Sequence, residues 1–255
     1  MTVSDFGMSG VLIVTGGSRG IGAETARLAA AAGYAVCVNY YVNRSAADAV
    51  VAGIDRAGGR AVAVAADVAD EGDVVRLFET VDRAFGTVTA LVNNAGILDV
   101  QTRVEHLDQA RLSRVLAVNV TGAFLCTREA VRRMSTAHGG RGGAIVNVSS
   151  RAAVLGSPGE YVDYAASKAA LDALTIGVSK EVASEGIRVN SVRPGVIRTD
   201  IHASGGEPGR VDRLASTIPM QRGGEPIEVA RAILWLLSDE ASYTTGAFLD
   251  VSGGR

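Results

Sequence analysis

The chain has 255 residues, of which 47% are hydrophobic and 20% are charged, and its formal net charge is −2. This composition is typical of a globular protein with one large domain or two small ones. A charge this close to zero gives no electrostatic reason to expect binding to nucleic acid or to an anionic membrane. No stretch reaches the roughly 18–20 uninterrupted apolar residues that a membrane span requires.

The N-terminal residues and the cysteines allow a prediction of the cellular compartment of the protein. The first ten residues, MTVSDFGMSG, lack the basic start and the apolar run of a signal peptide, and we expect residues 1–9 to form a flexible tail. The two cysteines, Cys37 and Cys126, lie far apart inside apolar stretches and are predicted to be reduced core residues. These features predict a cytoplasmic protein.

Short apolar runs alternate with helix-length segments along the whole chain. The runs are rich in β-branched residues, as parallel strands covered on both faces are, and occupy 11–15, 35–40, 61–66, 89–94, 144–149, 187–192 and 247–251. The segments that predict helices are 21–32, 45–57, 71–85, 108–136, 164–185 and 225–238. The Gly/Pro-rich residues 204–210 predict a surface loop over the end of the sheet. The sequence therefore predicts one α/β domain over residues 1–255, a Rossmann-like, doubly wound parallel sheet of about seven strands with helices on both faces.

A glycine-rich turn follows the first predicted strand. Gly16, Gly20 and Gly22 have the spacing G-x-x-x-G-x-G, and a helix begins there. Glycines allow a tight turn and a close approach of the backbone to a pyrophosphate, which binds the free N–H groups at the helix N-terminus. A glycine turn can also join a strand to a helix without any ligand, but its place after the first strand is the one that a dinucleotide fingerprint requires.

Four further motifs follow in a fixed order. They are NNAG at 93–96, Ser150, YAASK at 164–168 and RPG at 193–195. With the glycine spacing, which differs from the usual G-x-G-x-x-G, they make the chain resemble the classical short-chain dehydrogenases/reductases from Val11 to the C-terminus. Within that family the chain looks like an uncharacterised bacterial subgroup that is labelled glucose 1-dehydrogenase-like or 3-oxoacyl-carrier-protein-reductase-like. The resemblance implies hydride transfer between a nicotinamide cofactor and a ketone or secondary alcohol.

Tyr161 and Tyr164 both precede Lys168, but only one has the spacing that this chemistry needs. Lowering a tyrosine pKa from ~10 to ~7 takes roughly 4 kcal/mol, which a lysine ammonium at ~4 Å supplies in an effective dielectric near ~20. Tyr164 and Lys168 are four residues apart and share one helix face. Tyr164 is therefore predicted to be the acid/base, with its pKa lowered by Lys168, in agreement with the family motif Y-x-x-x-K. Tyr161 is predicted to lie at or before the helix start and to line the substrate pocket, with surface packing as an equal alternative.

The resemblance implies two further catalytic residues. Ser150 closes a predicted strand at the edge of the sheet where ligands bind, and would orient and stabilise the substrate oxygen. Its neighbour Ser149 is expected to face the packing side of the strand. Asn119 would hold a water that links Lys168 to solvent in a proton relay, and a hydrogen-bonded core asparagine is the alternative.

The resemblance also implies the contacts with the cofactor. Asp67 and Val68 resemble the adenine-binding pair, residues 94–96 would line the ribose side, and residues 194–199 would hold the carboxamide. The predicted cofactor set is Gly16, Ser18, Arg19, Gly20, Ile21, Gly22, Asn39, Tyr40, Asp67, Val68, Asn94, Ala95, Gly96, Tyr164, Lys168, Pro194, Gly195, Ile197 and Thr199. The three histidines show no ligand spacing, so no metal site is predicted.

The end of the second predicted strand favours NADP(H). NAD-specific sites usually place there an acidic residue that bonds the ribose hydroxyls and repels a 2′-phosphate. Asn39, Tyr40 and Tyr41 occupy this region without a carboxylate, and Arg19 or Arg44 could pair with the phosphate. The sequence predicts a preference for NADP(H), with NAD(H) possible and equally good if Arg19 is only a solvated turn residue.

Alternatives remain for activity, substrate and assembly. A catalytically inactive dinucleotide-binding regulatory or scaffold protein is the alternative to an enzyme that acts on a small carbonyl or alcohol. If the protein is an enzyme, its substrate could be a sugar-like polyol or a 3-oxoacyl thioester.

An arginine cluster could dock an acidic carrier protein, although a solvated helix face or a subunit contact is favoured. The cluster comprises Arg128, Arg132 and Arg133. Small residues along 164–185 permit close helix packing, and the resemblance implies a homotetramer; they are Ala165, Ala166, Ala169, Ala170 and Ala173.

Overall fold

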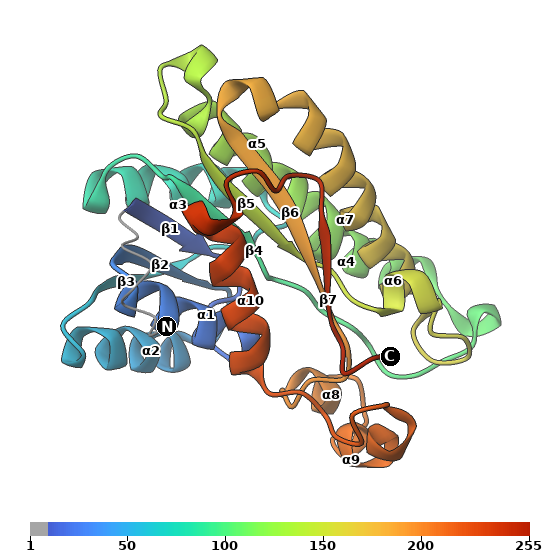
Figure 1. Cartoon of the computed structure of the whole chain (residues 1–255). Coiled ribbons are helices and arrows are strands. Elements are labelled where there is room, and N and C mark those ends of the chain that lie inside the picture. The colour runs from blue at the N-terminus through green and yellow to red at the C-terminus, as the bar shows by residue number, and fades with distance from the viewer. Residues whose placement is uncertain (1–9) are drawn as a thin grey trace.

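The computed structural model describes residues 10–255, so the predicted tail at 1–9 lies outside the described residues. Seven parallel strands form one sheet in the order β3-β2-β1-β4-β5-β6-β7 (Figure 1). They are β1 (Gly10–Val14), β2 (Tyr34–Tyr40), β3 (Arg60–Ala65), β4 (Ala90–Asn93), β5 (Gly143–Val148), β6 (Ile187–Pro194) and β7 (Phe248–Val251). Each predicted strand is present with small shifts of its ends, and the predicted α/β sheet is confirmed.

Helices cover both faces of the sheet (Figure 1). One face packs against α1 (Gly20–Ala31), α2 (Arg44–Arg56) and α10 (Pro226–Leu237). The other packs against α3 (Glu71–Phe85), α5 (Gly122–Met134) and α7 (Val162–Glu181). This two-sided covering explains why the strands are apolar at nearly every position rather than at every second one.

Strand β1 shows how alternate side chains enter two separate cores. Leu12 and Val14 pack in the cluster under α1 and α10, whereas Ile13 packs in the cluster under α3 and α5. Each such fully buried aliphatic side chain contributes about 1.5–3 kcal/mol through the hydrophobic effect. Cys37 and Cys126 are buried in the second cluster as free thiols, as expected.

The long helix predicted over 108–136 is wrong in one respect, because the segment is not continuous α-helix. It consists of α4 (Gln109–Leu116), a π-helical turn at Ala117–Thr121, and α5. The side chain of Asn119 in this turn bonds the backbone of Ile97 on both sides, with Nδ2 to the carbonyl at 2.8 Å and Oδ1 to the N–H at 2.8 Å. A π turn of this kind commonly marks a functional region of a helix.

The strand order reverses between β1 and β4, and their carboxyl ends open onto a crevice, which is where ligands bind in sheets of this type. Short helices lie around this end: α6 (Ala152–Leu155), α8 (Ile201–Ser204) and α9 (Arg210–Leu214). The predicted loop at 204–210 connects the last two. In the part of the chain that the structure describes, no helix is both long and apolar enough to cross a membrane.

Candidate active site

A cavity of about 1070 Å³ runs along the carboxyl ends of the strands. Ligand pockets for single small molecules usually measure about 300–1,000 Å³, so this one has room for a large ligand or for two. It is lined by all the predicted site residues except Gly22 and Asn119. Those two lie behind its wall.

The glycine-rich turn forms one wall of the cavity. Gly16 and Gly20 have φ values of +60° and +53°, which favour glycine. A Cβ on Gly22 would lie 2.5 Å from the side-chain nitrogen of Asn94 and 2.5 Å from the Gly16 carbonyl oxygen, so this glycine supports the turn from behind. No side chain caps α1 at Arg19, which leaves the first-turn N–H groups available to an anion. The turn therefore fits a pyrophosphate.

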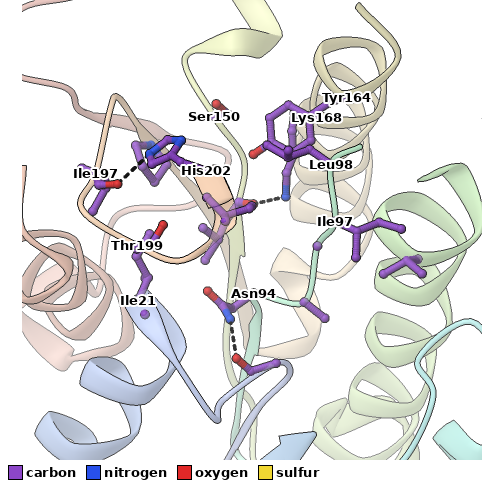
Figure 2. A pocket seen from close by; sticks show the side chains of 18 of the residues that line it. Ile21, Asn94, Ile97, Leu98, Ser150, Tyr164, Lys168, Ile197, Thr199 and His202 are labelled. Atoms are coloured by element: carbon purple, nitrogen blue, oxygen red, sulfur yellow. Dashed lines mark hydrogen bonds between the residues drawn. The ribbon is translucent and has the colours of Figure 1, made fainter. Parts of the chain in front are cut away.

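Asn39 and Asn94 have a role that the sequence pattern did not indicate, because both hold the glycine turn in place. Asn39 accepts a hydrogen bond from the Gly16 N–H at 3.2 Å and donates to the Ala66 carbonyl at 3.1 Å. Asn94 donates to the carbonyls of Thr15 and Gly16 at 2.9 and 3.0 Å (Figure 2). These bonds tie the ends of β1, β2, β3 and β4 together, so a change in either amide would disturb the whole turn.

The far end of the cavity lies beside β2 and β3. Tyr40 and Asp67 line it, and the Asp67 carboxylate accepts a hydrogen bond from the Ala69 N–H at 2.9 Å. Arg19 also lines it, and within residues 10–255 no carboxylate forms an ion pair with its guanidinium. Arg44, the second candidate for a phosphate, is instead 3.4 Å from Asp48 on the exposed face of α2. Of the two arginines, only Arg19 is placed at the cavity.

Helix α7 begins at the cavity and carries the tyrosine and the lysine. Tyr161 is its N-cap residue, as predicted, and Tyr164 lies in the first turn. Asp163, next to Tyr164, forms a buried bidentate ion pair with Arg111 of α4, with distances of 2.7 and 3.1 Å. Bidentate arginine–carboxylate pairs fix orientation as well as position. This pair anchors the first turn of α7, and nothing in the sequence pattern had pointed to it.

Three side chains, one from the segment just after β5 and two from α7, line the middle of the cavity (Figure 2). The buried Lys168 ammonium donates to the Val148 carbonyl at 2.8 Å and lies 5.6 Å from the centre of the Tyr164 ring. The Ser150 hydroxyl accepts a hydrogen bond from the Ala152 N–H at 3.1 Å, and the Ser150 side chain lowers the pKa of the nearby Tyr164. Ser149 points the other way and donates to the Lys168 carbonyl at 3.1 Å, as expected for the packing side.

The electrostatics of Tyr164 differ from the sequence-based expectation. Burial raises the pKa of Tyr164 to about 12, and the Ser150 side chain only partly opposes this. Burial also lowers the pKa of Lys168 to about 8, against the attraction of Asp172. The sequence-based expectation of a lowered pKa considered only the attraction of the Lys168 ammonium. It left out the loss of solvent around the phenol, which disfavours the phenolate and raises the pKa. The protein groups described here therefore keep Tyr164 protonated.

Asn119 lies in the π-helical turn, fully buried beside the cavity wall. Besides its two bonds to Ile97, its amide donates to the Ser167 hydroxyl at 2.9 Å. A Cβ on Gly96 would come within 3.2 Å of the Lys168 nitrogen and 3.6 Å of the Asn119 side-chain oxygen, so the glycine lets these groups approach. Asn119 thus has the contacts of a hydrogen-bonded core asparagine, which was the alternative to a relay residue.

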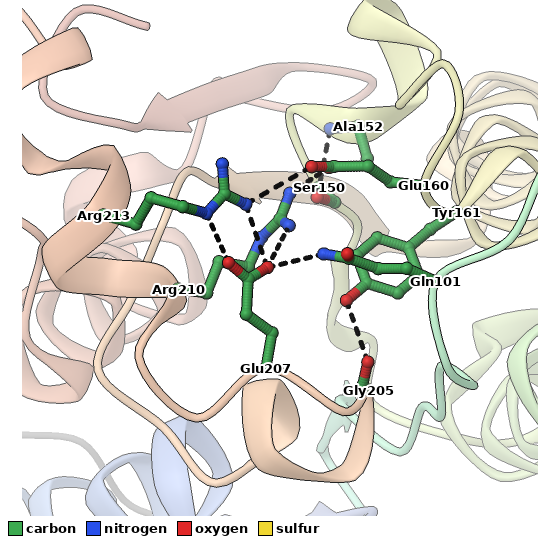
Figure 3. A network of polar contacts seen from close by, with 9 residues as sticks. All are labelled: Gln101, Ser150, Ala152, Glu160, Tyr161, Gly205, Glu207, Arg210 and Arg213. Carbon is green, nitrogen blue, oxygen red and sulfur yellow. Dashed lines mark hydrogen bonds and ion pairs between the residues drawn. The ribbon is translucent and has the colours of Figure 1, made fainter.

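A network of ion pairs lies at the end of the cavity formed by α8 and α9 (Figure 3). Glu207 accepts hydrogen bonds from Arg210 at 2.9 Å and from Arg213, and both arginines also pair with Glu160. Gln101, from the segment after β4, donates to the same Glu207 carboxylate at 2.5 Å. The network therefore links three segments that are far apart in the sequence.

Tyr161 belongs to this end of the cavity. It is only 3% exposed, and its hydroxyl donates to the Gly205 carbonyl at 3.1 Å (Figure 3). Its predicted place in the cavity wall is confirmed, and surface packing is excluded. His202 of α8 and Arg210 of α9 also line the cavity, and no motif in the sequence had pointed to them.

The structure also shows the surroundings of the arginine cluster and of the side chains that could bind a metal. Arg128, Arg132 and Arg133 all pair with Glu129, and Arg128 and Arg133 have further partners on α3. The cluster is thus an ion-paired helix face rather than a free cationic patch. Within residues 10–255, no group of three histidine, cysteine, aspartate or glutamate side chains is placed to hold a metal ion.

The comparisons with known proteins agree with this site. The family described as "Enoyl-(Acyl carrier protein) reductase" matches residues 16–255. The chain is 62% identical over 245 residues to the uncharacterized oxidoreductase YgfF of Escherichia coli K12, covering 96% of this chain and 99% of that protein. It is 43% identical over 248 residues to a 3-oxoacyl-[acyl-carrier-protein] reductase of Synechocystis, covering 96% of each.

A comparison of the fold with a solved structure points to the same family. A short-chain type dehydrogenase/reductase from Mycobacterium marinum superposes with a TM-score of 0.92 at 32% identity, covering 100% of this chain and 98% of that one. Its fold and the motif order of this chain point to one family. The chain therefore belongs to the short-chain dehydrogenase/reductase family of NAD(P)-dependent oxidoreductases.

Proposed function

We propose that the protein reduces a ketone, or oxidises the corresponding secondary alcohol, by hydride exchange with NADP(H). The observation that carries this is the convergence of Ser150, Tyr164 and Lys168 in one cavity with the glycine turn. A bound reduced nicotinamide supplies the hydride to the carbonyl carbon. The chain's own residues have to hold the substrate, polarise its oxygen and deliver one proton.

In the reducing direction each residue has one task. The Ser150 hydroxyl donates a hydrogen bond to the carbonyl oxygen and stabilises the charge that develops there. The Tyr164 hydroxyl donates its proton to the same oxygen, which completes the alcohol. Lys168, when protonated, stabilises the phenolate that remains, and would also bond the nicotinamide ribose. Asn119 holds the π turn and Ile97 in place behind Lys168, which supports a proton path without itself reaching the cavity.

The cofactor would lie along the wall formed by the ends of β1 to β4. Gly16, Gly20 and the first turn of α1 would hold its pyrophosphate, and Asp67 with Val68 its adenine. Thr199 would reach its carboxamide, since this residue lies 3.2 Å from where a Cβ on Gly20 would be, which places 194–199 beside the glycine turn. The close fit of the turn supports this placement.

The preference for NADP(H) rests on the end of β2. Asn39, Tyr40 and Tyr41 bring no carboxylate there, and Arg19 lines the same part of the cavity without an ion-pair partner in the described chain. A charge-assisted bond to a 2′-phosphate contributes about 1.5–3 kcal/mol, which is about a ten- to hundred-fold preference.

We predict that kcat/KM is higher for NADPH than for NADH by this factor. Arg19→Ala should remove this cofactor preference, and Tyr40→Asp should move it toward NADH. Equal values for the two cofactors in the wild type would contradict the assignment.

The test of the activity itself is direct. The protein is mixed with NADPH and a panel of ketones, and the loss of reduced-nicotinamide absorbance is followed. Turnover of at least one ketone is expected, and its loss in Tyr164→Phe ties it to this site. Binding of NADPH without turnover of any ketone or alcohol would instead favour the inactive regulatory or scaffold protein.

A further inference from the structure

Leu155 is an apolar side chain of the cavity wall that the rest of the chain does not cover. It is the last residue of α6, which begins two residues after Ser150, and it is 45% exposed. Leu155 lines the cavity, whereas the neighbouring Val154, which is 52% exposed, does not. Part of the free surface of Leu155 therefore faces the cavity, where a bound molecule can remove it from water. Such burial is favourable in proportion to the apolar area.

Leu98 is a second apolar side chain of this wall, and Figure 2 draws it with Tyr164 and Lys168 among the residues that line the cavity. Gly96, two residues before it, lies next to the reacting groups, because a Cβ there would be 3.2 Å from the Lys168 nitrogen. A Cβ on Gly205 would be 2.2 Å from Leu98 Cδ1, so the loop after α8 packs directly on Leu98. This contact holds Leu98 in the cavity wall.

Several large polar side chains at this end of the cavity already have partners within the protein. Arg210 forms ion pairs with two carboxylates, and the Tyr161 hydroxyl donates to the Gly205 carbonyl at 3.1 Å. His202 Nε2 is 2.8 Å from the Ile197 carbonyl oxygen, and its Nδ1 is buried. A polyol would find few free partners here for its hydroxyl groups, and removing unpaired hydroxyls from water is costly.

We infer that the substrate carries an apolar group of several carbons, an alkyl chain or a ring, which packs against an apolar wall formed by Leu98 and Leu155. The enzyme therefore selects alkyl and aryl ketones, including 3-oxoacyl thioesters with an alkyl chain, over hydroxy ketones and polyols. This inference rests on the proposed function and names its substrate class. Each methylene that the wall removes from water should raise kcat/KM about four-fold.

The first experiment uses the wild type, NADPH and matched ketones. The alkyl series is butan-2-one, pentan-2-one and hexan-2-one. The polar ketones are 4-hydroxybutan-2-one, in which a hydroxyl replaces the terminal methyl of pentan-2-one, and erythrulose, which has the carbon skeleton of butan-2-one. We expect kcat/KM to rise about four-fold with each methylene, and each alkyl ketone to exceed its polar match by at least about four-fold. A flat series, or better turnover of the polar ketones, would overturn the inference.

Variants of the two leucines locate the contact. Leu155→Asn and Leu98→Asn replace apolar surface with an amide of similar size, and each should lower the gain per methylene to about two-fold or less. Val154→Ala, next to Leu155 but outside the cavity wall, is the matched control and should keep the gain of about four-fold. Thermal unfolding of all three variants checks the fold. A full gain in both leucine variants, or an equal loss in Val154→Ala, would contradict the role of this wall.

A failure of the proposed function gives a different result. If no ketone is turned over, calorimetry measures the dissociation constants of butan-2-ol, pentan-2-ol and hexan-2-ol for the complex of the protein with NADPH. Constants that fall about four-fold with each methylene would keep the apolar wall and refute the reaction. Turnover of every ketone with equal efficiency would refute the wall and leave the reaction standing. Absence of turnover together with a flat series of dissociation constants would overturn both.

Discussion

Tyr161 and Tyr164 lie three residues apart at the start of α7, and their hydroxyl groups have different partners. Tyr161 donates to the Gly205 carbonyl, whereas Tyr164 lines the same cavity as Ser150 and lies near Lys168. We predict that Tyr164→Phe abolishes turnover while the dissociation constant for NADPH stays within a few-fold. Tyr161→Phe should keep most of the activity. Steady-state rates and NADPH fluorescence titration of both variants decide the matter, and the reverse pattern would show that the wrong tyrosine was assigned.

Lys168 is a single charged residue whose burial has a cost for stability. Its pKa in the folded chain is about 8, below the ordinary value of 10.5. Between these two values the unfolded chain binds a proton that the folded chain does not, so this group makes stability rise with pH. Below about pH 8 both states are charged, and the full penalty of roughly 3 kcal/mol applies.

Replacing Lys168 by methionine should remove this pH dependence together with the activity. Relative to Lys168→Met, the wild type should gain about 2 kcal/mol in free energy of unfolding between pH ~7 and pH ~9.5. Urea unfolding of both proteins at the two pH values gives the difference, and the contributions of Tyr164 and other groups cancel. An unchanged difference would mean that Lys168 keeps its ordinary pKa in the fold.

At the scale of elements, the segment 201–217 is held over the cavity by charges rather than by a large core. The apolar cluster that it forms with flanking residues is small and consists of Val196, Val211, Leu214 and Ile218. Glu207 connects this segment to Gln101 and, through the arginines, to Glu160 (Figure 3). The arginine partners hold the pKa of Glu207 at about 2, below its ordinary value, so the network stays charged until the pH falls toward that value.

Glu207→Gln should loosen this segment without touching the reacting groups. We expect KM for the ketone to rise several-fold and kcat to stay within about two-fold, because bound substrate is held less well while Tyr164 is undisturbed. Glu79→Gln, which removes a carboxylate beside Arg83 on remote α3, is the matched control and should leave both constants unchanged. A fall in kcat alone would show that the network acts on the chemistry instead.

At the scale of the whole molecule, α7 has one face in the core and one face at the surface. Ala165 is buried, but Ala166, Ala169 and Ala173 are exposed on the same side, and Phe124 of α5 is 50% exposed. Small residues allow a close helix–helix approach, and exposed apolar side chains gain by burial in an interface. With the family resemblance, these features support a dimer through α5 and α7, and a second interface along β7, at the sheet edge, would make it a tetramer.

Ala173→Arg should prevent this association, because a long charged side chain would separate the paired helices. Light scattering at micromolar concentration is expected to show a tetramer for the wild type and a smaller species for the variant. Ala52→Arg, at an exposed position of α2, is the control and should keep the wild-type mass. A monomeric wild type would refute the predicted assembly.

Much of this architecture was readable from local sequence. The seven strands are short apolar runs, and burial on both faces of a parallel sheet imposes that pattern on each run separately. The glycine turn and the Tyr164–Lys168 spacing were equally readable, because backbone conformation at Gly16 and a four-residue helical spacing are set by neighbours in the chain.

What the sequence by itself determined, then, is the family fold, the place of the glycine turn and the tyrosine and lysine that share one helix face in the cavity. Only the tertiary structure decided the break in the helix at Asn119, since a contact with the distant Ile97 forms it. The raised pKa of Tyr164 likewise depends on how much solvent the surrounding segments remove. Desolvation and long-range hydrogen bonds are properties of the packed chain, and no local pattern encodes them.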